Sequence, residues 1–413
     1  MSSLRAGVLT VAEANPAEAL ARHPRVAKAL ENLDRSLGWI TEQQTQLTEI
    51  SAPTFQEHAR AAAVQKILSA NGYKTRSDSA GNVIAERPGS SRKDVVLLSA
   101  HLDTVFPAGT PLHVHKDGHN FSAPGIADNG AGLAALVGLA RAVHEAKLQT
   151  RMTLIFAANT GEEGEGNLRG MRKLVESYRG RLRAVIAIDG ASVEHVTTMG
   201  LGSRRIEVIL SGPGGHSWAD FGTPNPIHAL SRGIARFLDV RVPDNPRTTY
   251  NIGLVEGGSS VNSIPDHALM KIDLRSESEA ELERLESALR RTIAEGIDAE
   301  MAASRLAGRA DATRLDAKFK SLGVRPVGEL AADSPLLEAL RDADRLLGNQ
   351  SRLERSSTDA NIPLALGIPA IAIGGGGRAG GAHTLAEWYD STGREIGLKR
   401  ILLTALAVAG IED

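Results

Sequence analysis

Cysteine is absent from the 413 residues, which excludes disulfide bonds, thiolate nucleophiles and thiolate metal ligands. Any metal site must therefore be built from histidine and carboxylate groups. A charge excess of one sign is also missing, because 47 Lys and Arg offset 49 Asp and Glu to a net charge of −2. Such a chain offers no basic field to nucleic acid or to an anionic membrane. We therefore expect neither as a partner.

Long apolar runs are missing too. No stretch reaches the roughly 20 residues that span a bilayer, and residues 1–20 lack the basic segment and continuous apolar run of an export signal. We expect a soluble, cytoplasmic protein. Aromatic residues make up only 3% of the chain, whereas 42 glycines indicate many tight turns. The length suggests about two or three domains.

Four apolar segments have the length of buried strands, and each leads into polar residues. These segments are 94–99, 152–158, 184–188 and 368–373. In an open parallel α/β sheet, the ligand crevice lies outside the carboxyl ends of the strands. The side chains that follow the four segments should therefore converge: His101 and Asp103, Glu162 and Glu163, Asp189, and His383.

Asp128 is a further candidate, since it precedes a long apolar helix that we expect to begin near Gly130. Glu162 and Glu163 are neighbours at a strand end, so they cannot point the same way. One can bind a cation while the other accepts a proton from the water that the cation polarises. Taken singly, each candidate has a commoner explanation, such as a surface carboxylate, a packed histidine or a helix N-cap. Their concentration at the ends of one sheet favours a metal-assisted hydrolase.

The remaining periodicity predicts helices at 24–49, 55–71, 334–347 and 396–409, and short strands at 73–76 and 82–86. From residue 202 the order becomes strand, helix, two strands, helix, strand, at 204–210, 226–238, 248–255, 267–274, 279–295 and 313–320. This β-α-β-β-α-β order is typical of a small α+β domain. We predict an α/β fold with a mixed or parallel sheet covered by helices on both faces, formed by residues 1–200 and 324–413. The α+β domain, residues 201–323, is inserted between them.

Five ordered motifs closely resemble those of the M20 metallopeptidase family, which includes glutamate carboxypeptidases, acetylornithine deacetylases, succinyl-diaminopimelate desuccinylases, aminoacylases and tripeptidases. The motifs are His-Leu-Asp-Thr-Val at 101–105, Gly-Ile-Ala-Asp-Asn-Gly at 125–130, Gly-Glu-Glu-Gly at 161–164, Asp189, and Gly-Ala-His-Thr at 381–384. The resemblance covers nearly the whole chain from about residue 33. It implies a zinc-exopeptidase-like fold, two divalent ions, and an inserted domain that acts as a lid and joins a homodimer. Zinc is the expected metal, and histidine and carboxylate ligands also suit cobalt or manganese.

The resemblance also implies a role for each candidate. Asp128 would bridge the two ions, with His101 and Asp189 completing one ligand set and Glu163 and His383 the other. A hydroxide shared by the ions would attack the amide carbon. Glu162 would pass the proton of the water to the leaving amine, and Asp103 would hold the second nitrogen of the His101 ring.

The lid motifs imply substrate contacts. His216 would reach the active site of the partner subunit and help to bind the scissile carbonyl, and Asn262 and Arg275 would grip the terminal carboxylate of the substrate. The segment 356–360 resembles a family segment near the site, without an assigned role. The expected substrate is a small peptide cleaved by an exopeptidase, and an N-acyl amino acid cleaved by a deacylase is the alternative.

Three other interpretations compete. Residues 375–380 formally fit the dinucleotide-binding pattern Gly-x-Gly-x-x-Gly, but no helix is expected to open from them. Ser217 lies in a near match to a nucleophile elbow, with Ala219 in place of the second glycine. A serine hydrolase therefore stays an alternative, as does a non-enzymatic binding protein on the same fold. The complete ligand set together with Glu162 favours the metal-dependent enzyme.

Overall fold

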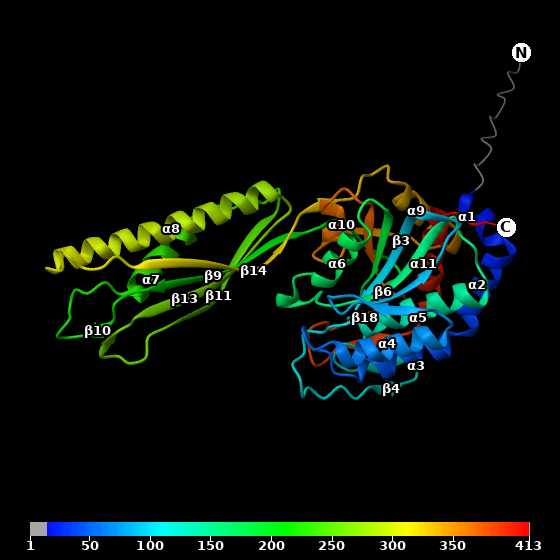
Figure 1. Cartoon of the computed structure of the whole chain (residues 1–413), viewed down its shortest axis with the longest axis horizontal. Coiled ribbons are helices and arrows are strands. Elements are labelled where there is room, and N and C mark those ends of the chain that lie inside the picture. Colours follow the sequence, from blue (N-terminus) through cyan, green and yellow to red (C-terminus); the bar gives the residue numbers. More distant parts are fainter. Residues whose placement is uncertain (1–14, 413) are drawn as a thin grey trace, which may run out of the picture.

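The computed structural model describes residues 15–412; residues 1–14, part of the segment in which no export signal is expected, lie outside this range. Figure 1 shows two lobes side by side along the long axis of the molecule. The larger lobe has a central sheet with helices on both sides, and the smaller lobe is an elongated sheet with helices along one side. Among the described helices, none is both long and apolar enough to cross a bilayer.

The central sheet of the larger lobe follows the order β1-β2-β6-β3-β7-β17-β8-β15, and β16 pairs with β8. Strands β6, β3, β7 and β17 are parallel to one another, whereas β2 and β8 pair antiparallel at either side of this group. The sheet is therefore mixed, and the predicted fold class is confirmed. The bounds are β1 Thr75–Ser77, β2 Val83–Arg87, β3 Ser91–His101, β6 Met152–Asn159, β7 Leu182–Ile188, β8 His195–Gly200, β15 Gly328–Glu329, β16 Arg352–Ser356 and β17 Ala370–Ile373.

The helices of the larger lobe enclose one continuous hydrophobic core. Helix α5 is buried along almost its whole length and contacts β3, β6 and β7, as expected for a helix without a polar face. The bounds are α1 Pro16–Arg22, α2 Pro24–Arg35, α3 Leu37–Thr48, α4 His58–Ala70, α5 Gly130–Glu145, α6 Arg169–Ser177, α9 Pro335–Leu347, α10 Asn361–Ala365 and α11 Arg394–Ala409, with a 3-10 turn at Gly164–Gly166.

Two predicted helices differ from those observed. The helix expected at 24–49 is broken at Ser36, whose amide bonds to the carbonyls of Asn32 and Leu33 and ends α2, while its own carbonyl accepts from Ile40 in α3. The break changes the direction of the chain, yet the buried residues Leu33 and Ile40 both reach the core. The helix expected from residue 55 begins at His58, because Phe55 has a φ of 74°, which is outside the helical region.

The smaller lobe is built from an antiparallel sheet in the order β11-β13-β9-β14. Alternate residues of β9 and β13, such as Val208 and Ile272, pack with helices α7 and α8 in a core of their own. The positions between them, including Arg205 and Arg275, point to the opposite face of the sheet. The bounds are β9 Gly202–Ser211, α7 Pro226–Leu238, β11 Thr248–Gly257, β13 His267–Ser276, α8 Glu279–Leu306 and β14 Asp316–Arg325.

Further features of both lobes were not predicted. Helix α8 continues past residue 295, because Ile297 and Met301 extend its buried stripe. The last strand, expected at 313–320, is displaced toward the C-terminus and ends at Arg325. Two short sheets are added: β10 Gly215–His216 pairs with β12 Ser263–Ile264 at the tip of the smaller lobe, and β18 Arg378–Gly380, β19 Trp388–Asp390, β5 Asn120–Ser122 and β4 His115–Asp117 form a sheet beside the central one.

Candidate active site

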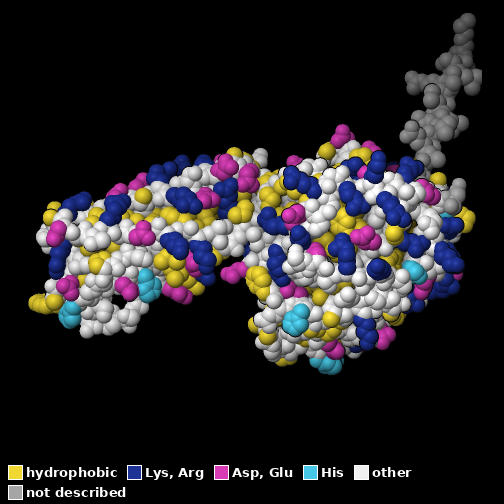
Figure 2. Space-filling view, viewed as in Figure 1, with side chains coloured by type: hydrophobic (Ala, Val, Ile, Leu, Met, Phe, Trp, Pro, Cys, Tyr) yellow, Lys and Arg dark blue, Asp and Glu magenta, His cyan; other side chains and the backbone are white. Residues whose placement is uncertain are grey.

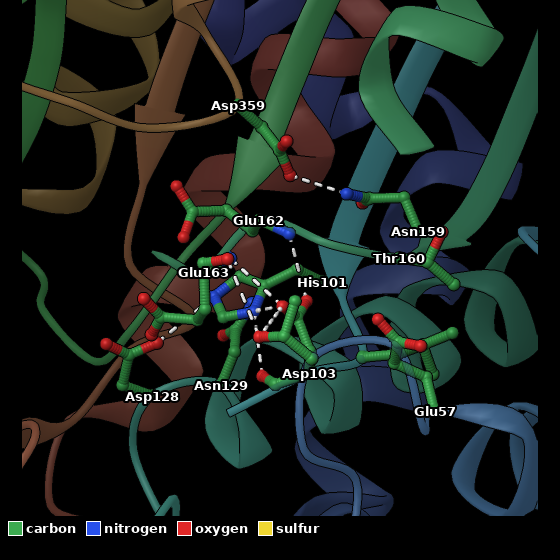
Figure 3. Close-up of polar contacts among 12 residues, drawn as sticks. Glu57, His101, Asp103, Asp128, Asn129, Asn159, Thr160, Glu162, Glu163 and Asp359 are labelled. Carbon is green, nitrogen blue, oxygen red and sulfur yellow. Dashed lines mark hydrogen bonds and ion pairs between the residues drawn. The ribbon is translucent and has the colours of Figure 1, made fainter. Parts of the chain in front are cut away.

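The five predicted metal ligands lie together at the carboxyl ends of the parallel strands. His101 ends β3, Asp189 follows β7, Glu163 follows β6, His383 lies in the loop between β18 and β19, and Asp128 precedes α5. They form two groups, His101 with Asp128 and Asp189, and Asp128 with Glu163 and His383. Within each group, the ligand atoms all lie within 4.8 Å of one another. Asp128 belongs to both groups, and Figure 3 shows it beside His101 and Glu163.

The carboxylate of Asp128 has one oxygen directed to each histidine. Nε2 of His101 lies 3.1 Å from Oδ1 of Asp128 and 3.5 Å from Oδ1 of Asp189. Nε2 of His383 lies 3.2 Å from Oδ2 of Asp128 and 3.0 Å from Oε1 of Glu163. A single carboxylate shared in this way has the arrangement of a bridging ligand.

These close approaches alter the pKa values of the site. Hydrogen bonds to Asp128 and Glu163 raise the pKa of His383 to about 10. Burial opposes ionisation of Asp128, but the two histidines outweigh this effect and hold the pKa of Asp128 below its usual range. Burial likewise lowers the pKa of His101, and the surrounding carboxylates reverse the shift and raise it. The carboxylates of the site therefore attract positive charge to the ring nitrogens of His101 and His383. Metal cations that bind these nitrogens would replace the protons and neutralise the carboxylates.

Asn129 fixes Asp128 relative to the end of β7. Its Nδ2 donates to the carbonyl of Ile188 at 2.9 Å, and its Oδ1 accepts from the amides of Gly132 at 3.0 Å and Gly190 at 3.1 Å. A Cβ atom at Gly132 would lie 2.0 Å from Oδ1 of Asn129, so only glycine fits at this position. The start of α5 and the end of β7 are thereby tied together beside the ligands.

Glu387 supports the same loop from the other side. Its fully buried carboxylate accepts hydrogen bonds from the amides of Gly125 at 2.9 Å and of Ala127 and Asp128 at 2.8 Å. We did not predict this residue. It lies in a loop without periodicity, and only the folded chain brings it to residues 125–128.

His383 has a left-handed backbone, with a φ of 63°. For a residue other than glycine or asparagine, this conformation costs on the order of 1–3 kcal/mol and is maintained only by the surrounding structure. Here the conformation directs Nε2 toward Asp128 and Glu163. The strain is located at one of the candidate ligands.

Asp103 has different contacts from those we expected. Nδ1 of His101 lies 3.1 Å from the main-chain oxygen of Asp103 and 3.7 Å from Oδ1 of its carboxylate. The carboxylate accepts instead from the amides of Glu162 and Glu163, both at 3.0 Å, and from the hydroxyl of Thr54 at 2.9 Å. Asp103 therefore contacts the ring of His101 mainly through its main chain, and its side chain holds the Glu162–Glu163 turn (Figure 3).

Glu162 lies next to the ligands but belongs to neither ligand group. Its carboxylate is buried and forms an ion pair with Arg325, with 3.0 Å between Oε1 and Nη1. Burial raises the pKa of Glu162 well above its usual value, although Arg325 and His101 act in the opposite direction. A carboxyl group with a raised pKa beside a metal site is suited to accept and return a proton.

The segment 356–360 contributes a buried acid close to these residues. Oδ2 of Asp359 accepts from Nδ2 of Asn159 at 2.6 Å, which links it to the end of β6 (Figure 3). Burial raises the pKa of Asp359 to about 7. The segment that resembles the family thus lies against the end of β6, the strand that leads into the Glu162–Glu163 turn.

A cavity of about 520 Å³ opens over the site and is lined by Asp128, Glu162, Glu163, Asp189 and His383. Arg205, Arg275 and Arg325, from three neighbouring strands of the smaller lobe, line the same cavity. On the face shown in Figure 2, a notch separates the two lobes.

Of the three predicted substrate residues, Arg275 alone is among those that line this cavity. His216 and Asn262 lie together at the tip of the smaller lobe, where the amide of Ser217 bonds to the carbonyl of Asn262 at 3.0 Å. Both residues are exposed. The structure therefore separates these two residues from the ligands of their own chain.

The two competing motifs do not form the geometry that their chemistry needs. Nδ1 of His216 accepts from the amides of Trp218 and Ala219, at 3.2 and 3.3 Å, so this nitrogen is not available as the base for Ser217. Residues 375–380 lead from β17 into β18 rather than into a helix, whereas a dinucleotide site needs the helix N-terminus.

Comparison with known proteins gives consistent matches. The sequence profile of peptidase family M20/M25/M40 matches residues 97–407. A Mycobacterium tuberculosis protein assigned as a succinyl-diaminopimelate desuccinylase, DapE, is 28% identical over 305 residues, which cover 72% of this chain and 78% of that protein.

Two solved structures match over almost their whole length. A tripeptidase from Staphylococcus aureus has a TM-score of 0.72 at 19% identity and covers 90% of this chain and 98% of its own. The Bacillus subtilis YXEP protein, described as a dinuclear metal binding peptidase of the M20 family, has a TM-score of 0.66 at 19% identity, with 91% and 99% covered. At this identity the two structures establish the fold. The profile match spans well over half of the chain and includes all five candidate ligands, and we conclude that the chain belongs to peptidase family M20/M25/M40 and is a hydrolase of peptide bonds.

Proposed function

We propose that this protein is a two-metal exopeptidase that cleaves small peptides. The observation that carries the proposal is the pair of ligand groups that share Asp128, with the non-ligand Glu162 beside them. The tripeptidase name of the Staphylococcus aureus structure supports a peptide substrate. The desuccinylase name of the Mycobacterium tuberculosis relative keeps an N-acyl amino acid deacylase as the second candidate.

The residues of the site fit divalent ions. Nε2 of His101 and Oδ1 of Asp128 are buried and face each other at 3.1 Å, yet neither atom has a hydrogen bond of acceptable geometry among the described residues, although buried polar atoms are nearly always satisfied. The donor set of imidazole nitrogen and carboxylate oxygen suits Zn²⁺, with Co²⁺ and Mn²⁺ as alternatives. His101, Asp128 and Asp189 would hold one ion, and Asp128, Glu163 and His383 the second. When bound, such ions polarise the scissile carbonyl and lower the pKa of water.

The side chains of this chain carry the proton transfers. Glu162 accepts the proton of the attacking water and returns it to the leaving amine, which needs a carboxyl group with a raised pKa close to the reacting atoms. Asp103 holds the amides of Glu162 and Glu163 and thereby keeps the base and a ligand in fixed relation. Its main-chain oxygen orients the His101 ring, which is the usual form of support for a metal-binding histidine.

Arg275 and Asn262 bind the terminal carboxylate of the substrate in this proposal. Arg275 lines the cavity. Its Nε pairs with Asp273 at 2.7 Å, and the remaining fork of its guanidinium suits a carboxylate. Because Nδ1 of His216 accepts main-chain N–H groups, a neutral ring carries its proton on Nε2. Nε2 is then a donor suited to the oxygen of the scissile carbonyl.

We further propose that residues 201–323 form a lid that joins two copies of the chain, between catalytic segments 1–200 and 324–413. The smaller lobe exposes several large apolar side chains: Trp218, Phe221, Leu238, Val255, Val261 and Leu306, and hydrophobic side chains are visible along its flank in Figure 2. Such exposure marks interaction surfaces. In the dimer, His216 and Asn262 of one copy would complete the cavity of the other. The cytoplasmic location stays a prediction.

Mixed dimers test whether His216 acts across the interface. His216→Ala and Glu162→Ala homodimers should both have very low activity. Subunit exchange between them should restore about one quarter of wild-type activity, because half of the dimers are mixed and each mixed dimer has one complete site. The measurement is peptide hydrolysis before and after exchange.

The matched control pairs Glu162→Ala with Asp128→Ala. Both of these residues belong to the same catalytic centre, so exchange should restore nothing. Absence of recovery in the His216 experiment, with exchange verified by native mass spectrometry, would place His216 in its own subunit or outside the reaction.

Substrate class is tested by release of product from a matched panel. Free di- and tripeptides are compared with N-acetyl and N-succinyl forms of the same amino acids, each with zinc-loaded enzyme and again with a chelator. We expect chelator-sensitive cleavage of the free peptides. Cleavage restricted to the acylated compounds would make the enzyme a deacylase, and chelator-resistant hydrolysis would contradict the two-metal centre. A serine-directed reagent provides the control for Ser217.

A further inference from the structure

Arg325 lies where the smaller lobe rejoins the larger one. It is the last residue of β14, pairs in register with Ser203 of β9, and belongs to the sheet of the smaller lobe. The residue itself is 6% exposed, which is rare for arginine unless its donors are used. The strand predicted at 313–320 ends before this residue, so Arg325 was not among the predicted site residues.

The guanidinium of Arg325 binds Glu162 at two points. Nη1 donates to Oε1 of the Glu162 carboxylate at 3.0 Å, and Nη2 donates to the main-chain oxygen of the same residue. Nη1 also contacts Oγ of Ser357 at 3.1 Å and its carbonyl oxygen at 3.2 Å. A planar guanidinium that holds both the main chain and the side chain of Glu162 restricts the direction in which the carboxylate points.

The remaining contacts of Glu162 make this restriction effective. Its amide donates to Oδ1 of Asp103 at 3.0 Å, and its carbonyl oxygen accepts from Arg325, so the main chain of Glu162 is held on both sides. Arg325 also sets the direction in which the carboxylate points. Arg325 bonds to Oε1, while Glu162 also lines the cavity above the ligands. The contact thus orients the carboxylate without removing it from the space in which a substrate would lie.

The end of β14 is itself anchored to the loop that follows Glu162. The amide of Val324 donates to Oδ1 of Asn167 at 2.9 Å, and Arg172 donates to the carbonyl oxygens of Val324 and Asn167. Arg205 of β9 reaches the carbonyl oxygen of Gly164. The smaller lobe therefore contacts the 162–167 loop at several points, of which Arg325 is the one that reaches the base.

We propose that Arg325 is a positioning residue that fixes the carboxylate of Glu162 for proton transfer and so makes the base depend on the placement of the smaller lobe. This inference rests on the proposed function, because it assigns Arg325 a task in the same reaction. The alternative role for an arginine in this cavity is to bind the substrate carboxylate directly, as proposed for Arg275. The two roles predict different kinetics, since orientation of the base affects kcat and binding of substrate affects KM.

A double-mutant cycle separates these roles. Arg325→Met in the wild-type background should lower kcat by about 100-fold, the size of effect that misplacement of a catalytic group by about 1 Å can produce, with KM changed by no more than about twofold. In a Glu162→Gln background, Arg325→Met should change the residual kcat by less than about threefold, because the group it positions no longer acts as a base. Arg325→Lys should recover part of the activity, since it retains the charge but not the fork.

Arg314→Met is the matched control. Arg314 is an exposed arginine just before β14 that pairs with Asp298 at 2.7 Å, away from Glu162, so its replacement should leave kcat within about twofold in both backgrounds. Thermal unfolding and metal content are measured for every variant. Should Arg325→Met fail to fold, the Arg325→Lys cycle provides the same comparison.

The outcomes are distinct. Loss of kcat that disappears in the Glu162→Gln background supports the positioning role. An increase in KM, or an equal loss in both backgrounds, would overturn it in favour of direct substrate binding or of a purely structural role. Wild-type enzyme that cleaves no member of the substrate panel would contradict the proposed function itself, and the inference with it.

Discussion

Glu162→Ala is expected to lower kcat by about 10²–10⁴-fold, the usual contribution of a general acid–base group, while both ions stay bound. The variant lacks the carboxyl group that, in the proposed reaction, takes the proton of the water and returns it to the leaving amine. The ligand atoms belong to other residues, so the metal content should not change. The measurement combines kcat and KM on the best peptide of the panel with metal analysis per protomer.

Two comparisons sharpen this test. Glu165 is an exposed carboxylate in the same loop, and Glu165→Ala should keep wild-type kcat. Glu162→Gln retains the size of the side chain and an acceptor for Arg325, so it should lose as much activity as Glu162→Ala with less disturbance of folding. Near-normal turnover of Glu162→Ala at full metal content would contradict the assignment as base, and loss of an ion would show that Glu162 acts as a ligand.

Asp128→Ala is expected to abolish activity by removing a ligand from both ions at once. Its two carboxylate oxygens approach different histidines, at 3.1 and 3.2 Å. The affinity for metal should fall by more than the roughly 10–100-fold that follows when a residue hydrogen-bonded to a metal ligand is replaced. Replacement of Asp189 or Glu163 by alanine removes a ligand from one group only and should weaken one ion preferentially. Metal analysis after buffer exchange and zinc titration calorimetry measure both effects.

The control for Asp128 is Asp117→Ala, which removes an exposed carboxylate from β4. It should bind two ions and keep full activity. Full retention of both ions by Asp128→Ala would contradict the bridging role. Retention of one ion would show that the two groups are independent and that Asp128 serves only one of them.

The sequence predicted the candidate metal ligands better than the residues that hold them in place. His101, Glu163 and Asp189 follow long apolar strands whose parallel pairing brings their ends together, and this rule needs only local pattern and topology. The support residues obey no such rule. Arg325 and Glu387 reach the site from distant positions in the chain, and neither spacing nor composition distinguishes them from other charged residues of loops and strand ends.

Local patterns also failed where the backbone departs from regular geometry. Ser36 breaks a helix that the apolar spacing continues through, and Phe55 delays the next one with a positive φ. The strands β4, β5, β18 and β19 are three residues each, too short for a period of two to be recognised. The sequence correctly indicated that Asp103 contacts the ring of His101. Whether its main chain or its side chain makes this contact depends on where the Glu162–Glu163 turn lies, and local sequence does not determine that position.

The carboxylate of Glu387, which accepts from the amides around Asp128, has a consequence for biosynthesis. Translation produces His101 and Asp128 long before it produces His383 and Glu387. A nascent chain that has folded its first strands would therefore still lack one candidate ligand and the buried carboxylate that holds the loop around Asp128. On the proposed function, the site can assemble only after residues 383–387 have been made, and a product truncated before residue 383 should not cleave peptides.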